Sequence, residues 1–356
     1  MIEILSVLGP ASVQDLGRFD QYRFGVGTSG AMDDIALRAG NILLANDENA
    51  AGIEIPMTPF KLRFGRDTAF ALTGADAGAD LGGRAIPPWW RSQARAGDVL
   101  SLKAMTRGAR SYLTVGGGID VPVVLGSRST QLRGQLGGLH GRSLQPGDVL
   151  PCTAPDSSAC IGELGTEPAD IALARPNAPA GVTVVRVVIA GEYDMYDGVA
   201  QDLFWRSDWK VTPQSNRYGY RLQGPAVMPI SPVEKRSHGI VPGVVQIPPN
   251  GQPIIQMRDA QTSGGYPMIA TVIEADLWRV GQTGLGGALR FEQTSYPDAL
   301  AAGDEVSAYL DRLRVNVRRL GEFKKCRWTR QRSNAWRRSW SDPVSRQSKS
   351  RKMDSR

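Results

Sequence analysis

The sequence predicts a mainly β protein with a few helices, an α+β fold, in two domains. The chain has 356 residues, more than the roughly 250 to 300 at which a single hydrophobic core stops growing. It holds 41 Gly and 23 Pro beside an ordinary hydrophobic fraction of 41%, so the excess Gly and Pro belongs to turns between elements. Its apolar runs are short and closely spaced, which favours strands over helices.

The first domain is expected over residues 1–155, as a β-rich unit with one helix. Residues 1–8 alternate as a strand does, and a Gly-rich polar loop follows. The next segment, AMDDIALRAGNILLANDENAAGIEI, contains the apolar face of a helix. Ser29 or Asp33 can cap this helix, and Asn46 ends it. Further strands are expected in the runs GIEI, KLRF, TAFALTG, DVLSL, SYLTVGGGI and DVLPC. Such runs favour a small barrel or sandwich over a βαβ sheet.

The second domain is expected over residues 183–312. Residues 156–182 are rich in Ala, Pro and Ser and show little periodicity, so we expect them to form a linker between the domains. The second domain opens with the strand-like run VTVVRVVI, and a helix-like segment around residues 199–205 follows. Strands are then expected in YRLQG, GVVQIP, QPIIQMRD and MIATVIEAD.

The last segment, residues 313–356, differs in composition from everything before it. The formal net charge is +7, and residues 312–356 hold 16 Lys and Arg against 3 Asp and Glu, so the preceding part is acidic. Because blocks of like charge repel and seldom fold, we expect a disordered extension. Three Trp among the Arg also suit contacts with a nucleic acid, which is the less favoured interpretation.

Cysteine and histidine usage indicates a reducing compartment and no metal centre. The three cysteines, Cys152, Cys160 and Cys326, form no CxxC pair, and His140 and His238 have no metal-ligand spacing. Cys152 and Cys160 are close enough in sequence to pair, but two reduced thiols are expected. The N-terminus lacks a basic region, and no run of about 18 apolar residues occurs. We therefore expect a cytoplasmic protein that does not span a membrane.

The strongest candidate site is a set of polar side chains among strong β-formers in residues 246–276. A strand face loaded with amides is normally excluded from a core, because buried amides cost free energy unless they are hydrogen-bonded. Such a face suits recognition of a small polar amide or carboxylate, with Asp259 as the catalytic group that transfers a proton. The substrate-binding residues expected here are Gln246, Gln252, Gln261 and Thr262.

Two other segments carry polar groups suited to the same site. SVQDLGRFDQYRFGVGTSGAMDD leads into a helix start, where backbone N–H groups favour carboxylates or phosphates. SNRYGY offers an amide and a guanidinium that can hold a carboxylate through two hydrogen bonds. The alternative for the first segment is an ion pair between Asp15 and Arg18, with Ser29 only capping the helix. The candidate substrate-binding residues are Gln14, Arg18, Ser29, Asp33, Asn216, Arg217 and Tyr220.

Other mechanisms find little support in the sequence. Residues 127–130 offer three hydroxyls and one guanidinium after a Gly, but the loop has no GxxxxGK[ST] pattern, and a tight barrel turn explains it equally well. The chain contains no GxSxG elbow and no Rossmann fingerprint opening a βαβ unit.

Residues 1 to about 312 resemble the allophanate hydrolase subunit 2 family, also called the biotin-dependent carboxyltransferase family. The resemblance is carried by QDLGRFDQYRFGVGTSGAMDD, VGGGIDVPVVLGSRST, SNRYGYRLQGP and PPNGQPIIQMRDAQTSGGYPMIATVIEADL, in that order. It implies two cyclophilin-like β-barrel subdomains. It also implies a cleft shared with a second protein, the B subunit of the complex, which is KipI-like and homologous to allophanate hydrolase subunit 1.

The resemblance implies three alternative functions. The leading one is the C subunit of a 5-oxoprolinase, in which ATP drives the opening of 5-oxoproline to glutamate together with subunits A and B. The second is a carboxyltransferase that moves a carboxyl group from carboxybiotin to urea or a similar amide. Its biotin would come from another chain, because this one has no Met-Lys-Met carrier motif. The third is a non-enzymatic regulator that binds a KipI-like inhibitor of a histidine kinase.

Overall fold

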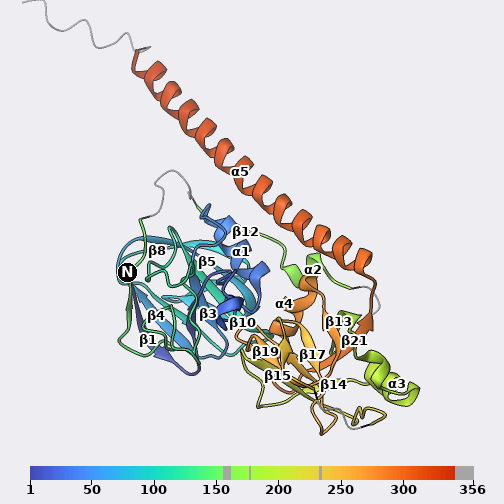
Figure 1. The fold of residues 1–356 in the computed structure, drawn as a ribbon. Coiled ribbons are helices and arrows are strands. Elements are labelled where there is room, and N and C mark those ends of the chain that lie inside the picture. The colour runs from blue at the N-terminus through green and yellow to red at the C-terminus, as the bar shows by residue number, and fades with distance from the viewer. Residues whose placement is uncertain (155–161, 176–177, 232–234, 341–356) are drawn as a thin grey trace, which may run out of the picture.

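The computed structural model describes residues 1–154, 162–175, 178–231 and 235–340, with side chains up to residue 320. The chain folds into two β-rich halves that lie side by side, and a long C-terminal helix runs across them (Figure 1). The expectation of a mainly β protein with a few helices is confirmed.

The first half contains two six-stranded sheets. One is ordered β11-β1-β4-β9-β6-β7, with β1 Ile2–Val7, β4 Phe60–Phe64, β6 Ala79–Leu81, β7 Arg84–Ile86, β9 Val99–Leu102 and β11 Val149–Leu150. The other is ordered β12-β8-β5-β10-β3-β2, with β2 Ser12–Gln14, β3 Gly52–Ile55, β5 Thr68–Asp76, β8 Trp90–Ala94, β10 Arg107–Val115 and β12 Leu164–Gly165. Each of the runs expected to be strands in this half contains one.

The two sheets pack face to face around one core. In β4, Phe60, Leu62 and Phe64 are buried, while the Lys and the Arg that alternate with them are exposed. Across the core, the ring centroids of Phe64 and Phe70 lie 5.2 Å apart. Within the described ranges no strand joins the sheets, so a sandwich replaces the barrel that the resemblance implied for this half. The strands at the edges of the two sheets are only two or three residues long.

Helix α1, Asp34–Leu43, covers the second sheet. Asp33 is its N-cap and accepts a hydrogen bond from the Ala36 backbone N–H at 2.8 Å. Of the two expected caps, Asp33 is therefore confirmed, and Ser29 lies outside the helix. After the helix, the Asn46 side-chain amide donates to the Val115 carbonyl oxygen at 2.8 Å, which ties the chain to β10.

The second half is a closed barrel of seven strands, as the resemblance implied for residues 183–312. Its strands follow the order β13-β20-β17-β18-β15-β14-β21, with β13 Val182–Ile189, β14 Trp209–Val211, β15 Gly219–Gln223, β17 Val244–Gln246, β18 Ile254–Gln256, β20 Met268–Val272 and β21 Ala288–Gln293. Helix α3, Gly198–Arg206, lies where a helix was expected, and Phe204 on it stacks on Phe291 with centroids 4.6 Å apart. A separate ribbon pairs β16, His238–Gly239, with β19, Ser263–Gly264.

Two segments differ from the expectation. The run MIATVIEAD is a strand only to Val272, after which α4, Glu274–Gln282, begins. Asp276 in its first turn is buried and binds the Arg186 guanidinium at 2.8 and 2.9 Å, a partner that sequence periodicity does not reveal. Within the expected linker, β12 pairs with β8, and a short helix, α2, spans Ala169–Ala172. That part of the linker therefore belongs to the first half.

Helix α5 spans Tyr296–Trp340 and crosses the expected boundary at residue 313 without a break. Residues 313–340 thus continue α5 in the structure, residues 341–356 lie outside the described part, and the disordered extension stays a prediction. Tyr309, Leu310 and Leu313 are buried at helical spacing against α1 and α4. The remaining domain boundaries stay a prediction.

No helix in the described part of the chain is long and apolar enough to cross a membrane. Cys152 is half-buried and free, and Cys160 lies outside the described residues, so the expected absence of a disulfide between them stays a prediction.

Candidate functional site

A cleft of about 1240 Å³ lies between the two halves. The barrel contributes residues 214–221, which include the start of β15, together with parts of β17 and β18 and residues 263–266. The first half contributes residues 108–110, at the start of β10, and the tip that carries Leu132 and Arg133. Cofactor and substrate sites commonly form at such junctions between domains.

The cleft brings together six of the residues expected from sequence. They come from three separate strands and the loops beside them, so their proximity is a property of the barrel. The expected residues that line the cleft are Asn216, Arg217, Tyr220, Gln246, Asp259 and Gln261. Their roles stay predictions.

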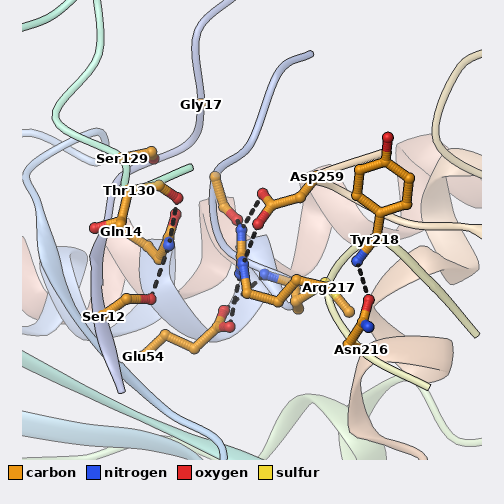
Figure 2. Close-up of polar contacts among 12 residues, drawn as sticks. Ser12, Gln14, Gly17, Glu54, Ser129, Thr130, Asn216, Arg217, Tyr218 and Asp259 are labelled. Carbon is orange, nitrogen blue, oxygen red and sulfur yellow. Dashed lines mark hydrogen bonds and ion pairs between the residues drawn. The ribbon is translucent and has the colours of Figure 1, made fainter. Parts of the chain in front are cut away.

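Arg217 is the centre of a buried ionic cluster on the inner wall of the cleft. Its Nε and Nη2 donate to the two Asp259 carboxylate oxygens at 3.0 and 2.9 Å. Its Nη1 donates to Glu54 Oε1 at 2.7 Å, and Nη2 also donates to the Gly30 carbonyl oxygen at 2.7 Å. Figure 2 shows the guanidinium between the two carboxylates. The cluster joins the halves, because Glu54 lies on β3 and Arg217 precedes β15.

Glu54 is held in its charged form by this cluster. Its Oε2 accepts hydrogen bonds from the Met32 N–H at 2.9 Å and from the Tyr112 hydroxyl at 2.7 Å. Burial alone would raise the pKa of Glu54, but the guanidiniums of Arg217 and Arg110 outweigh it, and the pKa is lowered. The pKa of Arg217 is raised for the matching reason: burial opposes its charge, and Asp259 and Glu54 outweigh burial.

A second buried link lies beside the first. Arg110 Nη1 donates to the Tyr220 hydroxyl at 2.6 Å and also to the Gly281 carbonyl oxygen. Gln282 on α4 accepts from the Arg110 N–H at 3.1 Å and donates to the Arg110 carbonyl oxygen at 3.0 Å. Residues from both halves therefore share one polar network under the cleft.

Sequence analysis missed Glu54, Arg110, Tyr112 and Gln282. A weak signal existed for Glu54, because it is the acidic residue in the apolar run GIEI. A carboxylate at a position expected to be buried needs a cationic partner. The partner's identity depends on how the halves pack, so the sequence alone could not supply it.

Asp33 lies behind the cleft and does not line it. It caps α1, and its Oδ2 accepts a hydrogen bond from Gln282 Nε2 at 2.8 Å. Burial, with smaller contributions from neighbouring carboxylates, raises the pKa of Asp33 to about 7. It borders a separate cavity of about 90 Å³ beside Trp89 and Trp278. The expected contact between Asp33 and a substrate in the cleft is therefore not supported.

Gln14, Arg18 and Ser29 also lie outside the cleft lining, and Figure 2 shows the Gln14 cluster apart from Arg217. Gln14 Nε2 donates to Ser12 Oγ at 2.9 Å and to the Thr130 carbonyl oxygen at 3.1 Å. Arg18 Nη2 donates to the Ser129 carbonyl oxygen at 2.6 Å. These contacts fasten the opening loop to residues 127–130, which explains why polar residues gather there.

The alternative ion pair between Asp15 and Arg18 is not formed. Asp15 instead accepts hydrogen bonds from the Ser127 hydroxyl at 2.6 Å, the Ser129 hydroxyl at 2.5 Å and the Arg128 N–H at 2.6 Å. The loop with three hydroxyls thus binds a carboxylate of its own chain, in agreement with its interpretation as a tight structural turn.

Gln252 and Thr262 do not line the cleft, although Thr262 lies between Gln261 and Ser263, which do. Gln252 forms two hydrogen bonds with the backbone of Gly224, at 2.9 and 3.1 Å, and borders a neighbouring cavity of about 630 Å³. The Thr262 carbonyl oxygen accepts from the Ile240 N–H at 3.1 Å, beside the β16 and β19 ribbon. Their expected contact with a substrate is not supported by these positions.

The outer rim of the cleft contains a contact between the halves. Arg133 donates to the Tyr218 hydroxyl, and its guanidinium carbon lies 5.0 Å from the centre of the Tyr218 ring. The Tyr218 hydroxyl in turn donates to Gln261 Oε1 at 3.3 Å. Asn216 is exposed, and its Oδ1 accepts from the Tyr218 N–H at 2.8 Å. The Gln261 and Asn216 side chains therefore hold Tyr218 in place.

Among the residues that the structure describes, the cleft lining is rich in guanidiniums and amides and contains one carboxylate, that of Asp259. Such a lining can bind a small anion or amide through directed hydrogen bonds. Over the described ranges, no group of three or more His, Cys, Asp or Glu is arranged to hold a metal ion.

Two bacterial proteins match this chain over nearly their full lengths. The C subunit of the Haemophilus influenzae 5-oxoprolinase is 43% identical over 314 residues, which cover 88% of this chain and 98% of that protein. The C subunit of the Escherichia coli 5-oxoprolinase is 43% identical over 315 residues, which cover 88% of this chain and 97% of that protein.

Among solved structures, the urea amidolyase of Kluyveromyces lactis superposes with a TM-score of 0.78 at 31% identity. The match covers 88% of this chain and 20% of that one, so this chain spans about a fifth of that protein. Residues 24–293 match the family described as carboxyltransferase domain, subdomain A and B. The chain therefore belongs to this family of carboxyltransferase domains.

Proposed function

We propose that the protein is the C subunit of a 5-oxoprolinase, in which ATP drives opening of the 5-oxoproline lactam to glutamate together with subunits A and B. The observation that carries this proposal is the match to the C subunit of the Haemophilus influenzae enzyme, which covers 98% of that protein. The cleft supports it, because its guanidiniums suit a carboxylate and its amides suit a lactam.

Asp259 is the proposed proton-transfer group, and Arg217 is proposed to position it. Each Asp259 oxygen accepts one hydrogen bond from Arg217 and keeps a second lone pair for a proton, so proton uptake weakens the ion pair without requiring either bond to break. Asn216, Tyr220, Gln246 and Gln261 are proposed to shape the substrate site around this pair.

ATP is proposed to bind to the complex. Arg110 and Arg217 are engaged by Glu54, which leaves Arg133 and Arg221 as the exposed guanidiniums of the cleft lining. The sequence has no GxxxxGK[ST] loop, so the residues of this chain form an incomplete triphosphate site. We propose that subunits A and B supply the rest of the ATP site and that the complex works in the cytoplasm.

The test is reconstitution of the three-subunit complex. This chain is purified with its A and B homologues, and release of ADP and glutamate is measured with 5-oxoproline. Turnover is expected only when all three subunits are present, and each omission serves as a control. A complete set that releases no glutamate from 5-oxoproline contradicts the proposal.

A second candidate function is that of a carboxyltransferase for urea or a related amide. We also propose that the barrel has cyclophilin-like topology. The superposition on the Kluyveromyces lactis urea amidolyase favours it. In this alternative Gln256 is proposed to bind the ureido N–H of a biotin from another chain, and the cleft volume of about 1240 Å³ accommodates one. Bound carboxybiotin would supply the carboxyl group. Urea-dependent loss of carboxylate from a biotinylated carrier protein, seen only when this chain is added, would support this alternative.

A further inference from the structure

Two buried amides on the cleft face of the barrel have a fixed orientation. Gln246 on β17 is 1% exposed, and Gln256 on β18 is 6% exposed. Gln246 Nε2 donates to the Tyr266 carbonyl oxygen at 3.1 Å. Because a carbonyl oxygen can only accept, this bond assigns the nitrogen and oxygen of the Gln246 amide without ambiguity.

The orientation of Gln246 determines that of Gln256. Gln246 Oε1 faces Gln256 and accepts a hydrogen bond from Gln256 Nε2 at 2.9 Å. Gln256 Oε1 is therefore the atom of this amide that remains available, and no described residue donates a hydrogen bond to it. Since Gln256 lines the cleft, its Oε1 is an acceptor that a ligand can reach.

Arg221 lies next to Gln256 on the same face. In the pairing of β15 with β18, Gly219 is opposite Gln256 and Arg221 is opposite Ile254. Strand alternation puts Gly219 and Arg221 on one face, so Arg221 and Gln256 are diagonal neighbours about 7 to 8 Å apart. Gly219 has no side chain, and a Cβ atom there would lie 3.1 Å from Ile254 Cγ2, so this glycine allows the two strands to pack closely.

The Arg221 guanidinium differs from those deeper in the cleft. Arg110 and Arg217 pair with Glu54. Arg221 is exposed and lines the cleft, and its side chain forms no ion pair with any residue that the structure describes. An unpaired guanidinium beside a fixed acceptor suits a ligand that carries a carboxylate and an N–H group.

We propose that Gln256 and Arg221 determine substrate specificity in this cleft: Gln256 Oε1 accepts the lactam N–H, and Arg221 binds the carboxylate of the same molecule. This inference rests on the proposed 5-oxoprolinase function and assigns the groups that recognise its substrate. It also separates the two candidate functions, because urea has N–H groups but no carboxylate for Arg221.

The experiment uses the assembled three-subunit complex and three ligands. These are 5-oxoproline, its lactone counterpart in which a ring oxygen replaces the N–H, and 2-pyrrolidinone, which lacks the carboxylate. In the wild type, the lactone is expected to inhibit with a Ki at least about threefold above the KM for 5-oxoproline, because it leaves the Gln256 acceptor unpaired. This comparison needs no variant.

Two variants test the residues separately. Gln256→Met is expected to raise the KM for 5-oxoproline about 3- to 10-fold and to lower the Ki of the lactone, because the variant has no acceptor for the lactone to leave unpaired. Arg221→Met is expected to raise both values about 10- to 100-fold and to leave the Ki of 2-pyrrolidinone unchanged. In both variants the KM for ATP is expected to keep its wild-type value.

The matched controls are Gln293→Met on β21 and Arg206→Met on α3, both exposed and outside the cleft lining. They are expected to behave as the wild type. If both test variants assemble and keep the wild-type KM for 5-oxoproline, the inference is overturned while the proposed function stands. A raised KM for ATP in Arg221→Met would assign Arg221 to phosphate and also overturn it. A wild-type complex without 5-oxoproline turnover overturns the proposed function and this inference together.

Discussion

At the residue scale, the centre of the molecule is a buried guanidinium between two buried carboxylates. Arg217 forms charge-assisted hydrogen bonds with Glu54 and Asp259 at 2.7 to 3.0 Å. Removing one partner from such a cluster costs more than the bonds themselves contribute, because the remaining charges stay buried without compensation.

Arg217→Met is therefore expected to destabilise the protein by about 3 to 5 kcal/mol. The variant leaves Glu54 and Asp259 facing each other without their shared cation. Urea denaturation followed by circular dichroism measures the change. Arg206→Met removes an exposed guanidinium that pairs with Asp202 at 3.5 Å and is expected to change stability by less than about 0.5 kcal/mol. Equal effects of the two variants would contradict the role given to Arg217.

The raised pKa of Asp33 predicts that the stability of the protein depends on pH. Burial raises its pKa from 3.8 to about 7 in the folded protein. Between those values the folded state holds a proton that the unfolded state has lost, so stability falls as pH rises from about 4 to 7 and levels off above. Asp33→Asn does not titrate and keeps the oxygen that caps α1.

The stability of Asp33→Asn relative to the wild type is therefore expected to rise between about pH 4.5 and 7.5. Urea midpoints measured for both proteins across this range test the expectation. If the urea midpoints of the two proteins change in parallel with pH, Asp33 is ionised throughout this pH range in the folded state.

At the element scale, α1 packs closely against the second sheet of the first half. A Cβ atom added at Gly40 would lie 2.7 Å from Thr114 Oγ1 and 3.2 Å from Thr73 Oγ1. Gly303 on α5 has open space instead, because no described atom lies within 4 Å of the position that a Cβ atom would take there. Close packing therefore requires a glycine at position 40 of α1, whereas no packing contact requires one at position 303 of α5.

Gly40→Ala is expected to destabilise the protein by about 1 to 3 kcal/mol through overpacking, although Ala favours helices. Gly303→Ala is expected to stabilise it by about 0.5 to 1 kcal/mol, because only the helix propensity changes. Thermal unfolding of both variants measures the difference. Stabilisation by both substitutions would show that α1 can move away from the sheet.

At the scale of the whole molecule, the buried ionic cluster around Arg217 connects the two halves. Glu54 belongs to the sandwich, and Arg217 belongs to the barrel, 163 residues later. Helix α5 adds to this connection by packing on α1 from the first half and α4 from the second. The cleft lies over this junction, so its shape depends on the relative position of the halves.

Arg217→Met is thus expected to speed amide hydrogen exchange in β3 as well as in β15, although Arg217 is part of the barrel half. Loss of the shared cation loosens the contact from both sides. Exchange measured by mass spectrometry on peptides that contain each strand tests this. Faster exchange confined to β15 would show that the halves open independently. Arg206→Met is the matched control and should leave both strands unchanged.

The sequence by itself determined the elements whose signals are local. Strand alternation, turn residues and the Asp33 cap depend on neighbours within a few positions, and they located α1, most strands and the polar segments around Arg217 and Asp259. Tertiary structure decided which polar residues meet. Gln14 and Arg18 bind the loop at residues 127–130, because folding of the first half brings these segments together. Glu54 pairs with Arg217 because the sandwich and the barrel pack against each other. The direction of the Gln256 amide was decided in the same way, by a hydrogen bond between two other residues.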